Sequence, residues 1–175
     1  MKRLLVIVFA LVILGCATTQ TVSNPGGYTY SLKRDDTFKL ELPVPEGWTA
    51  KLDRSRMERG TIVTYVVTAP NEDVILGITV MPPESTLTSQ QVIEAARKKV
   101  SQAMPGGVSD VERSVGGRRL KGLLVVQGDD RMMIFCVDHL SRVYVVVLDI
   151  KNAASQAERD AADYMLDRLR FLDGQ

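Results

Sequence analysis

The chain has 175 residues, a length that suits one globular domain better than two. Hydrophobic residues make up 45% of it, which is enough for an ordinary core and too many for a disordered chain. The formal net charge is only +1, so the protein has no strong positive field to attract nucleic acid, and we expect no DNA or RNA partner.

The first residues have the pattern of an export signal. Lys2 and Arg3 form a short basic start, and an unbroken apolar run follows from Leu4 to Leu14. As a helix this run would be roughly 16 Å long, too short for the roughly 30 Å hydrocarbon layer of a bilayer. The pattern therefore favours a signal peptide over a permanent anchor. Removal of residues 1–15 would leave 20 basic side chains against 21 acidic ones.

The end of the apolar run, Ile13-Leu14-Gly15-Cys16, resembles the lipobox of bacterial lipoproteins, which ends in a small residue followed by cysteine. The resemblance implies cleavage between Gly15 and Cys16, a diacylglyceryl thioether on the Cys16 sulfur, and a fatty acid such as palmitate on its amine. Only a thiol can form that thioether. Two or more acyl chains hold a protein stably at a membrane.

The residue after Cys16 indicates which membrane would carry the lipoprotein. In lipoproteins of bacteria with two membranes, aspartate at this position tends to retain the protein at the inner membrane. Alanine stands here, at Ala17. For an organism with two membranes, the resemblance therefore implies the outer membrane, with the domain facing the periplasm.

Residues 16–27 form the expected lipidated N-terminus and flexible tether. The residues after Cys16 are small and polar, and the segment finishes with Pro25-Gly26-Gly27. A flexible chain of this length has an average reach of about 18 Å. We expect a single domain over residues 28–175, held close to the membrane and able to turn freely.

The domain begins with a strand pattern. Phe38, Leu40 and Leu42 alternate with polar residues, which predicts a strand with one buried face. Pro43 and Pro45 are expected to end this strand, and a turn then leads into Trp48. Trp48 is the only tryptophan, and we expect it in the core, with a position in the wall of a groove as the alternative.

A basic segment follows Trp48. It contains Arg54, Arg56, Met57 and Arg59, and we interpret it as a loop. A solvated loop is the ordinary interpretation of such a charge pattern. The alternative is a partner-binding loop that contacts anionic headgroups or an acidic protein.

The middle of the chain changes from strand to helix. Two β-branched runs, Thr61–Ala69 and Val74–Met81, flank a polar turn and predict a hairpin. Thr88–Gln91 then fits a capping box, and the apolar residues that follow recur at helical spacing. Pro105–Gly107 is expected to stop this helix.

The last part predicts more strands and a final helix. Strands are expected at Leu120–Gln127, Met132–Val137 and Val143–Ile150, with a weaker one at Val108–Val115. A second capping box at Ser155 opens a helix whose apolar face extends to Leu172. The fold class is therefore α+β, an antiparallel β-sheet meander covered by two amphipathic helices.

This order of elements resembles the Mog1/PsbP-like fold. The family opens with a strand that leads into a Pro-x-Gly-Trp turn, here Phe38–Pro43 and Pro45–Trp48, and closes with a helix whose end looks like Met165–Leu172. The resemblance covers Tyr28–Leu172 and implies an α/β/α sandwich. Its members bind other proteins rather than catalyse a reaction, so it implies a protein-binding or assembly role, although fold analogy transfers no binding residues.

A bacterial lipocalin is the alternative family, because some lipocalins are lipoproteins of similar size. Lipocalins carry Gly-x-Trp in the first strand and one helix after eight strands. Here Gly47 and Trp48 are adjacent, and a helix interrupts the strands in mid-chain. We prefer the first resemblance and keep a carrier of a small apolar or lipidic ligand as the alternative function.

No catalytic pattern is apparent, and we expect neither an enzyme nor a cofactor. The only histidine, His139, is expected at the surface of a turn, and no Gly-x-Ser-x-Gly elbow is present. Cys136 is expected to be a small apolar core residue. One histidine and one spare cysteine do not make a zinc site, and the acidic turns lack calcium-loop spacing. The sequence thus predicts a lipoprotein with a noncatalytic domain that binds an envelope protein.

Overall fold

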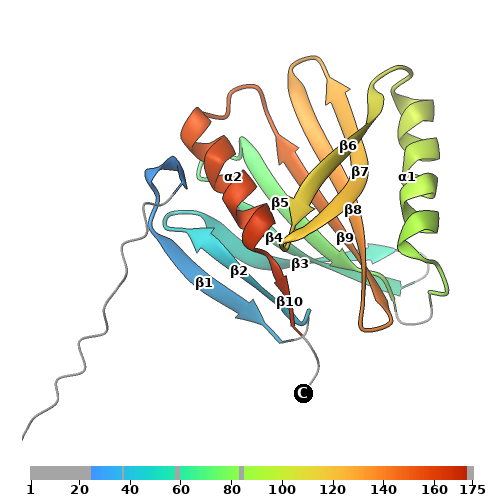
Figure 1. The fold of residues 1–175 in the computed structure, drawn as a ribbon, viewed down its shortest axis with the longest axis horizontal. Helices are drawn as coiled ribbons and strands as arrows, with labels where there is room; N and C mark the ends of the chain where they lie inside the picture. Colours follow the sequence, from blue (N-terminus) through green and yellow to red (C-terminus); the bar gives the residue numbers. More distant parts are fainter. Residues whose placement is uncertain (1–24, 37, 58–59, 83–84, 173–175) are drawn as a thin grey trace, which may run out of the picture.

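A computed structural model describes residues 25–36, 38–57, 60–82 and 85–172. In this part of the chain, ten β-strands form two antiparallel sheets, accompanied by two α-helices and a short 3-10 helix (Figure 1). The strands are β1 (Tyr30–Asp35), β2 (Leu40–Pro45), β3 (Thr49–Met57), β4 (Gly60–Thr68), β5 (Val74–Val80), β6 (Val108–Val115), β7 (Arg118–Gln127), β8 (Asp130–His139), β9 (Arg142–Ile150) and β10 (Arg170–Phe171). The helices are η1 (Pro25–Gly27), α1 (Ser89–Ala103) and α2 (Gln156–Arg168).

The strands are divided between a small and a large sheet. The small sheet has the order β1-β2-β10, and the large sheet has the order β3-β4-β5-β9-β8-β7-β6. The predicted α+β class, with two helices and an antiparallel meander, is confirmed. The sequence had suggested one sheet, however, and the structure places β1, β2 and β10 in a second one.

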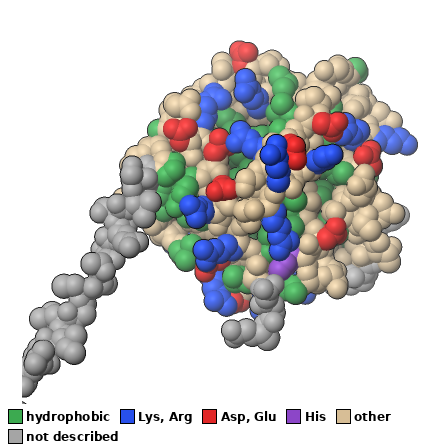
Figure 2. Space-filling view, in the orientation of Figure 1, with side chains coloured by type: hydrophobic (Ala, Val, Ile, Leu, Met, Phe, Trp, Pro, Cys, Tyr) green, Lys and Arg blue, Asp and Glu red, His purple; other side chains and the backbone are tan. Residues whose placement is uncertain are grey.

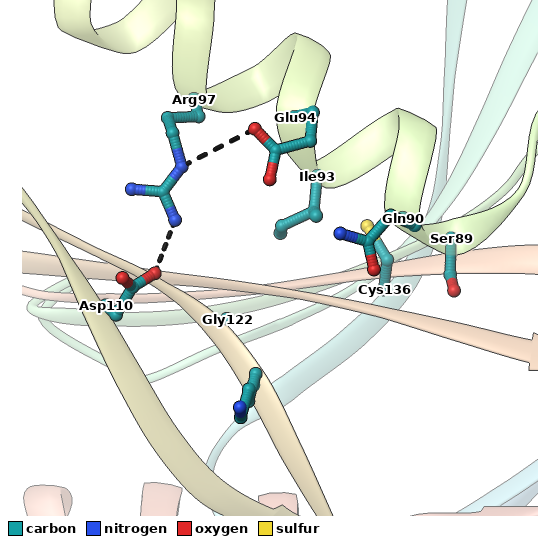
Figure 3. A pocket seen from close by; sticks show the side chains of 9 residues that line it. Ser89, Gln90, Ile93, Glu94, Arg97, Asp110, Gly122 and Cys136 are labelled. Atoms are coloured by element: carbon teal, nitrogen blue, oxygen red, sulfur yellow. Dashed lines mark hydrogen bonds and ion pairs between the residues drawn. The ribbon is translucent and has the colours of Figure 1, made fainter.

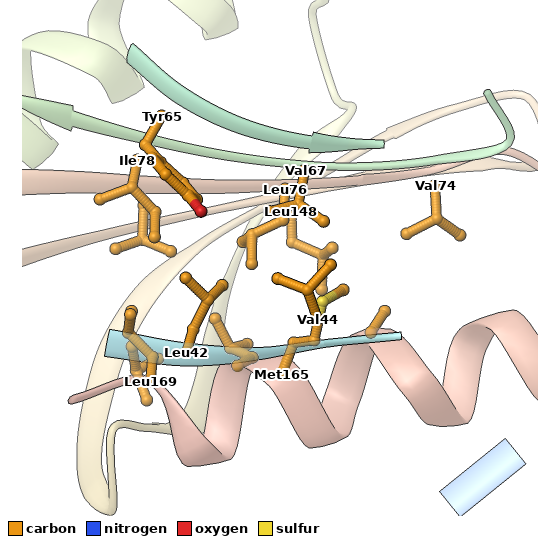
Figure 4. Packing of buried hydrophobic residues seen from close by; sticks show 14 of the residues in the cluster. Leu42, Val44, Tyr65, Val67, Val74, Leu76, Ile78, Leu148, Met165 and Leu169 are labelled. Atoms are coloured by element: carbon orange, nitrogen blue, oxygen red, sulfur yellow. The ribbon is translucent and has the colours of Figure 1, made fainter. Parts of the chain in front are cut away.

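The small sheet and α2 cover one face of the large sheet. Leu42 and Val44 of β2 and Met165 of α2 point toward the strands of the large sheet, and the main core fills the space between them (Figure 4). Leu42 and Met165 are completely buried. The hydroxyl of Tyr144 on β9 also links the two sheets, because it donates a buried 2.8 Å hydrogen bond to the carbonyl of Phe38.

Helix α1 covers the other face of the large sheet, over β6, β7 and β8. A second, smaller cluster of Leu123, Val125 and Ile134 lies beneath it. The helix residues that pack there are Ile93, Ala96 and Val100, followed by Met104. None of the α1 residues is buried. Helix α2, by contrast, has five buried residues, which are Glu158, Ala161, Ala162, Met165 and Leu166. The arrangement has helices on both sides of the large sheet, as the resemblance implied.

Both predicted helix starts are confirmed. Thr88 and Gln91 form a reciprocal capping box at α1, and Ser155 and Glu158 form another at α2. In each box a hydroxyl accepts a backbone N–H of the first turn while the longer side chain accepts the backbone N–H of the cap residue. The paired groups explain why each helix begins at a single defined residue.

Two proline positions correct the sequence-based boundaries. Pro43 and Pro45 do not end their strand, since β2 continues through both. Lys39, just before β2, accepts a hydrogen bond from the backbone N–H of Leu172, just after β10. Because backbone groups alternate in direction along a strand, the odd-numbered residues of β2 also direct theirs toward β10. Strand β10 reaches only as far as Glu41. Beyond that point no ladder partner needs the missing N–H groups, so proline is tolerated there.

The end of the described chain is also different from the expected helix. Helix α2 stops at Arg168, and Leu169 takes an extended conformation with φ −55° and ψ 127°. Arg170 and Phe171 then form β10, which pairs with β2. Leu169 remains completely buried, so its apolar character serves the core from outside the helix. The helical spacing of the sequence therefore extended too far.

Candidate functional site

The predicted lipidation residues Gly15 and Cys16 lie outside the described residues, and so does Arg59 of the basic segment. The rest of that segment is not a loop, contrary to the prediction. Arg54, Arg56 and Met57 belong to β3, which pairs with β4 along its whole length. Strand pairing uses backbone groups and needs no apolar side chains at the edge of a sheet. The charged composition of this segment therefore did not reveal the strand. Arg54 is exposed on this edge strand.

Trp48 lies in the main core, as predicted. Only 7% of it is exposed, and its ring packs edge-on to Tyr28 with 6.0 Å between ring centroids. A turn places Trp48 there. In this turn the backbone N–H of Trp48 donates to the carbonyl of Pro45, and Gly47 takes a φ of +85°. Only glycine adopts this conformation without strain. Trp48 therefore lies in the core rather than in the wall of a groove.

His139 is not a surface residue, contrary to the prediction. It is 8% exposed, and its ring lies against Tyr144 and Phe171 at centroid distances of 6.1 and 5.7 Å. Its Nε2 is 3.1 Å from the carbonyl oxygen of Leu172. The histidine therefore joins the end of β8 to the segment that carries β10. Its position at a strand end hid this role, because the partner is distant in sequence.

A hollow of about 180 Å³ opens between α1 and strands β6, β7 and β8 (Figure 3). The α1 side contributes polar and charged side chains, including Gln90, Glu94 and Arg97, and Asp110 and Lys121 lie on the strands. Its floor contains Gly122 and Cys136. The lining is thus mixed, since Ile93 also belongs to it.

Three of the charges at this hollow, those of Arg97, Asp110 and Glu94, are paired with one another. Arg97 forms an ion pair with Asp110 and a second, 3.8 Å pair with Glu94 (Figure 3). Asp110 is 80% exposed, so solvent weakens the attraction. These side chains hold α1 against β6 and are not oriented toward a common point in the hollow.

Cys136 is only partly buried and faces the α1 side of the large sheet, so its expected place in the core is wrong. Burial, assisted by the carboxylate of Asp138, raises the pKa of the Cys136 thiol to about 12. A thiol with so high a pKa is protonated at neutral pH, and only the thiolate is an effective nucleophile. Cys136 is therefore unsuited to nucleophilic catalysis.

This pKa predicts slow alkylation of Cys136 in the folded protein. Against an ordinary value of 9.0, a pKa of about 12 lowers the thiolate fraction at pH 8 about a thousandfold. A more basic thiolate is also more nucleophilic, which partly offsets this loss. We therefore expect Cys136 of the folded protein to react with iodoacetamide about fiftyfold more slowly than Cys136 of the urea-unfolded protein. The rate should rise with pH up to about 12 in Cys16→Ser protein; a plateau near pH 9 would contradict the assignment.

Among the described residues, the Ser89 and His139 side chains are not brought together. The Ser89 hydroxyl and backbone N–H both donate to the carboxylate of Asp138, beside the start of α1. His139 follows Asp138 in sequence, but its ring lies within hydrogen-bond distance of the Leu172 carbonyl and packs against Tyr144 and Phe171. Because successive strand residues face opposite sides, the serine and the histidine are separated by the sheet.

A second hollow, of about 220 Å³, lies near the start of α1. Its lining includes Met81, Leu87, Asp138 and Arg142. Within the described residues, no group of three or more histidine, cysteine, aspartate or glutamate side chains is placed to hold a metal ion. The described helices also include none that is both long and apolar enough to cross a membrane.

Comparison with solved structures identifies the fold. The cyanobacterial PsbP protein (CyanoP) of Synechocystis sp. PCC 6803 superposes with a TM-score of 0.53 at 14% identity, over 90% of this chain and 98% of that one. The fold is PsbP-like. LpqN of Mycobacterium tuberculosis, a protein involved in cell envelope biogenesis, has a TM-score of 0.41 at 14% identity over 81% of this chain and 89% of its own. No protein-family model matches this PsbP-like chain, and no curated protein does.

Proposed function

We propose that this protein is a lipid-anchored, noncatalytic module that binds another protein in the bacterial cell envelope. The observation that carries the proposal is the position of Gly15-Cys16 directly after a short apolar run with a basic start. The signal peptide explains export, and the cysteine explains retention at a membrane. The residue Ala17 favours the outer membrane, with the domain in the periplasm.

A protein-binding role is supported by the exposed edge of the large sheet. Strand β3 is the first strand of that sheet, so one of its edges has no neighbour in the sheet order. Lys51, Leu52, Asp53 and Arg54 are all exposed, although successive residues point to opposite faces. An accessible strand edge can add a strand from a partner through backbone hydrogen bonds. We propose that the partner-binding surface lies on β3 and includes Arg54, one residue of the predicted basic segment.

The alternative role, transport of a small apolar ligand, has less support. Pockets that enclose drug-sized ligands are usually about 300–1,000 Å³ and mostly apolar. The two hollows described above are about 180 and 220 Å³, and charged side chains contribute to both. A lipidic ligand would leave these side chains without water.

The anchor is tested by Cys16→Ser in the native host. We expect the wild-type protein in the membrane fraction, with a diacylglyceryl-modified N-terminal peptide in the mass spectrum. Cys16→Ser should lack this modification and remain uncleaved, because the lipid-dependent peptidase has no substrate. Cys136→Ser is the matched control and should behave like the wild type. Normal processing and retention of Cys16→Ser would refute the anchor.

The binding role is tested by photo-cross-linking from the surface of β3 in intact cells. A photoreactive residue replaces Arg54, and the control replaces Arg119 on β7, whose side chain is 78% exposed. We expect a discrete cross-linked protein from position 54 and none from position 119. Equal cross-linking at both positions would exclude β3 as a specific surface. Lipid that co-purifies with the protein, without a cross-linked partner, would support the carrier instead.

A further inference from the structure

The structure fixes the point where the N-terminal segment joins the domain. The hydroxyl of Tyr30 on β1 donates a 2.8 Å hydrogen bond to the carbonyl of Pro25 in η1. Gly26 packs so closely against α2 that a Cβ atom there would lie 2.3 Å from the carbonyl oxygen of Ala157. The chain therefore enters beside α2 and β1, on one side of the molecule (Figure 1).

Aromatic and basic side chains are gathered around this point. The rings of Tyr30 and Tyr164 have centroids 4.7 Å apart, and the guanidinium of Arg168 lies 5.8 Å from the centroid of Tyr164. Tyr28 packs against Trp48 nearby. Figure 2 shows hydrophobic side chains on the side of the domain where Figure 1 places η1, with Lys and Arg side chains next to them.

The most exposed large hydrophobic side chain of the described residues belongs to the same region. Leu32, in the middle of β1, is 63% exposed. Its strand pairs only with β2, so β1 is an edge of the small sheet. Lys33 and Arg34 follow Leu32 and are also exposed. An exposed leucine on a strand that begins with a tyrosine and continues with two basic residues has the composition of a surface at a membrane interface.

The lipid anchor would hold this edge close to a bilayer. Residues 16–24 separate Cys16 from η1, and nine residues span at most about 32 Å even when fully extended. An anchor at Cys16 would therefore keep β1 at a high effective concentration near the headgroups, where even a weak contact is populated. A protein partner is less suited to this edge, since the tether leaves little room between it and the membrane.

We infer that β1 is the membrane-facing edge of the domain and that Leu32 inserts into the interfacial region of the phospholipid bilayer. This inference rests on the proposed lipid anchor. The contact restricts the rotation of the domain more than the lipid anchor alone would. It also turns the far end of β3, which lies on the opposite side in Figure 1, away from the bilayer and toward a partner.

The test uses the full-length, lipidated protein with Cys136→Ser and one added cysteine. Leu32→Cys carries a polarity-sensitive fluorophore, and Leu52→Cys on edge strand β3, 41% exposed, is the matched control. The labelled proteins are reconstituted into phosphatidylethanolamine and phosphatidylglycerol vesicles. We expect a blue-shifted emission at position 32 and at least fivefold stronger quenching by lipid-borne spin labels than at position 52.

The outcomes separate this inference from the anchor itself. Mass spectrometry of the same samples reports lipidation; protein without acyl chains would overturn both proposals. Lipidated protein in which aqueous iodide quenches positions 32 and 52 equally would overturn the membrane-facing edge and leave the anchor intact. A cross-link from position 32 to a protein in cells, with a water-exposed label on vesicles, would assign β1 to a protein partner. Unchanged circular dichroism checks the fold of each variant.

Discussion

Replacing Gly122 with alanine is expected to destabilise the protein by about 3 kcal/mol. Gly122 lies on β7 directly opposite Phe135 of β8. An added Cβ atom would lie 2.4 Å from the carbonyl oxygen of Ile134 and 2.5 Å from a ring carbon of Phe135. The carbonyl is held in the sheet and cannot move aside as a flexible side chain would. We expect the midpoint of thermal unfolding to fall by about 9 °C, measured by circular dichroism in mild detergent.

Gly77→Ala is the matched control for this prediction. Gly77 is also inside a strand of the large sheet, on β5, but a Cβ atom there would meet the Cγ2 of Thr64 at 3.6 Å. That distance is an ordinary van der Waals contact. Alanine also restricts the unfolded chain more than glycine does, so we expect an unchanged or slightly higher midpoint. Equal effects of the two substitutions would show that crowding at Gly122 is not the cause.

Leu42→Ala is expected to destabilise the protein by a similar amount, about 3 kcal/mol. Leu42 is completely buried, and its side chain lies between β2 and the large sheet (Figure 4). Truncation removes apolar contacts and leaves a cavity between two sheets that cannot easily close over it. The same thermal measurement should show a midpoint lower by about 9 °C. The effect tests whether the small sheet is an integral part of the fold.

Leu32→Ala on the adjacent strand is the control for Leu42→Ala. The two residues are near each other, since Leu42 pairs with Lys33, but Leu32 is 63% exposed. Truncation of an exposed leucine should change the free energy of unfolding by less than about 0.5 kcal/mol. If both variants lost the same stability, β1 and β2 would have to pack differently from the structure described here.

The sequence was most informative where local chemistry alone determines an element. The capping boxes at Thr88 and Ser155 predicted the starts of α1 and α2, because both partners of each box lie within one helical turn. Strand β6, over Val108–Val115, has the predicted bounds. The next strands in the chain, β7, β8 and β9, were also predicted, but between one and four residues too short. Alternation and turn residues are local signals, so they needed no knowledge of the fold.

Elements that depend on distant partners were missed. Strand β3 contains few β-branched residues and forms because β4 lies beside it, with Arg54 opposite Val63. Strand β10 exists because β2 has a free edge at Glu41. In each case the tertiary pairing overrides the local preference of the sequence.

The same limit applies to the candidate site. His139 was interpreted as a surface residue because nothing near it in sequence reveals its partner, the Leu172 carbonyl. Cys136 was interpreted as a core residue because its strand is apolar, although the strand alternates between two differently packed faces. Sequence patterns show that a residue faces one side of a strand, but they do not show how deeply that side is covered.

The pairing of β10 with β2 has a consequence for the order in which the protein folds during synthesis. All strands of the large sheet leave the ribosome before Arg170 and Phe171 do, whereas β2 leaves before any of them. The apolar side chains of the β1–β2 hairpin therefore stay accessible until the large sheet and α2 have formed, and β10 completes the small sheet last. A chaperone that holds the emerging chain would be expected to bind this early hairpin and to release it when synthesis ends.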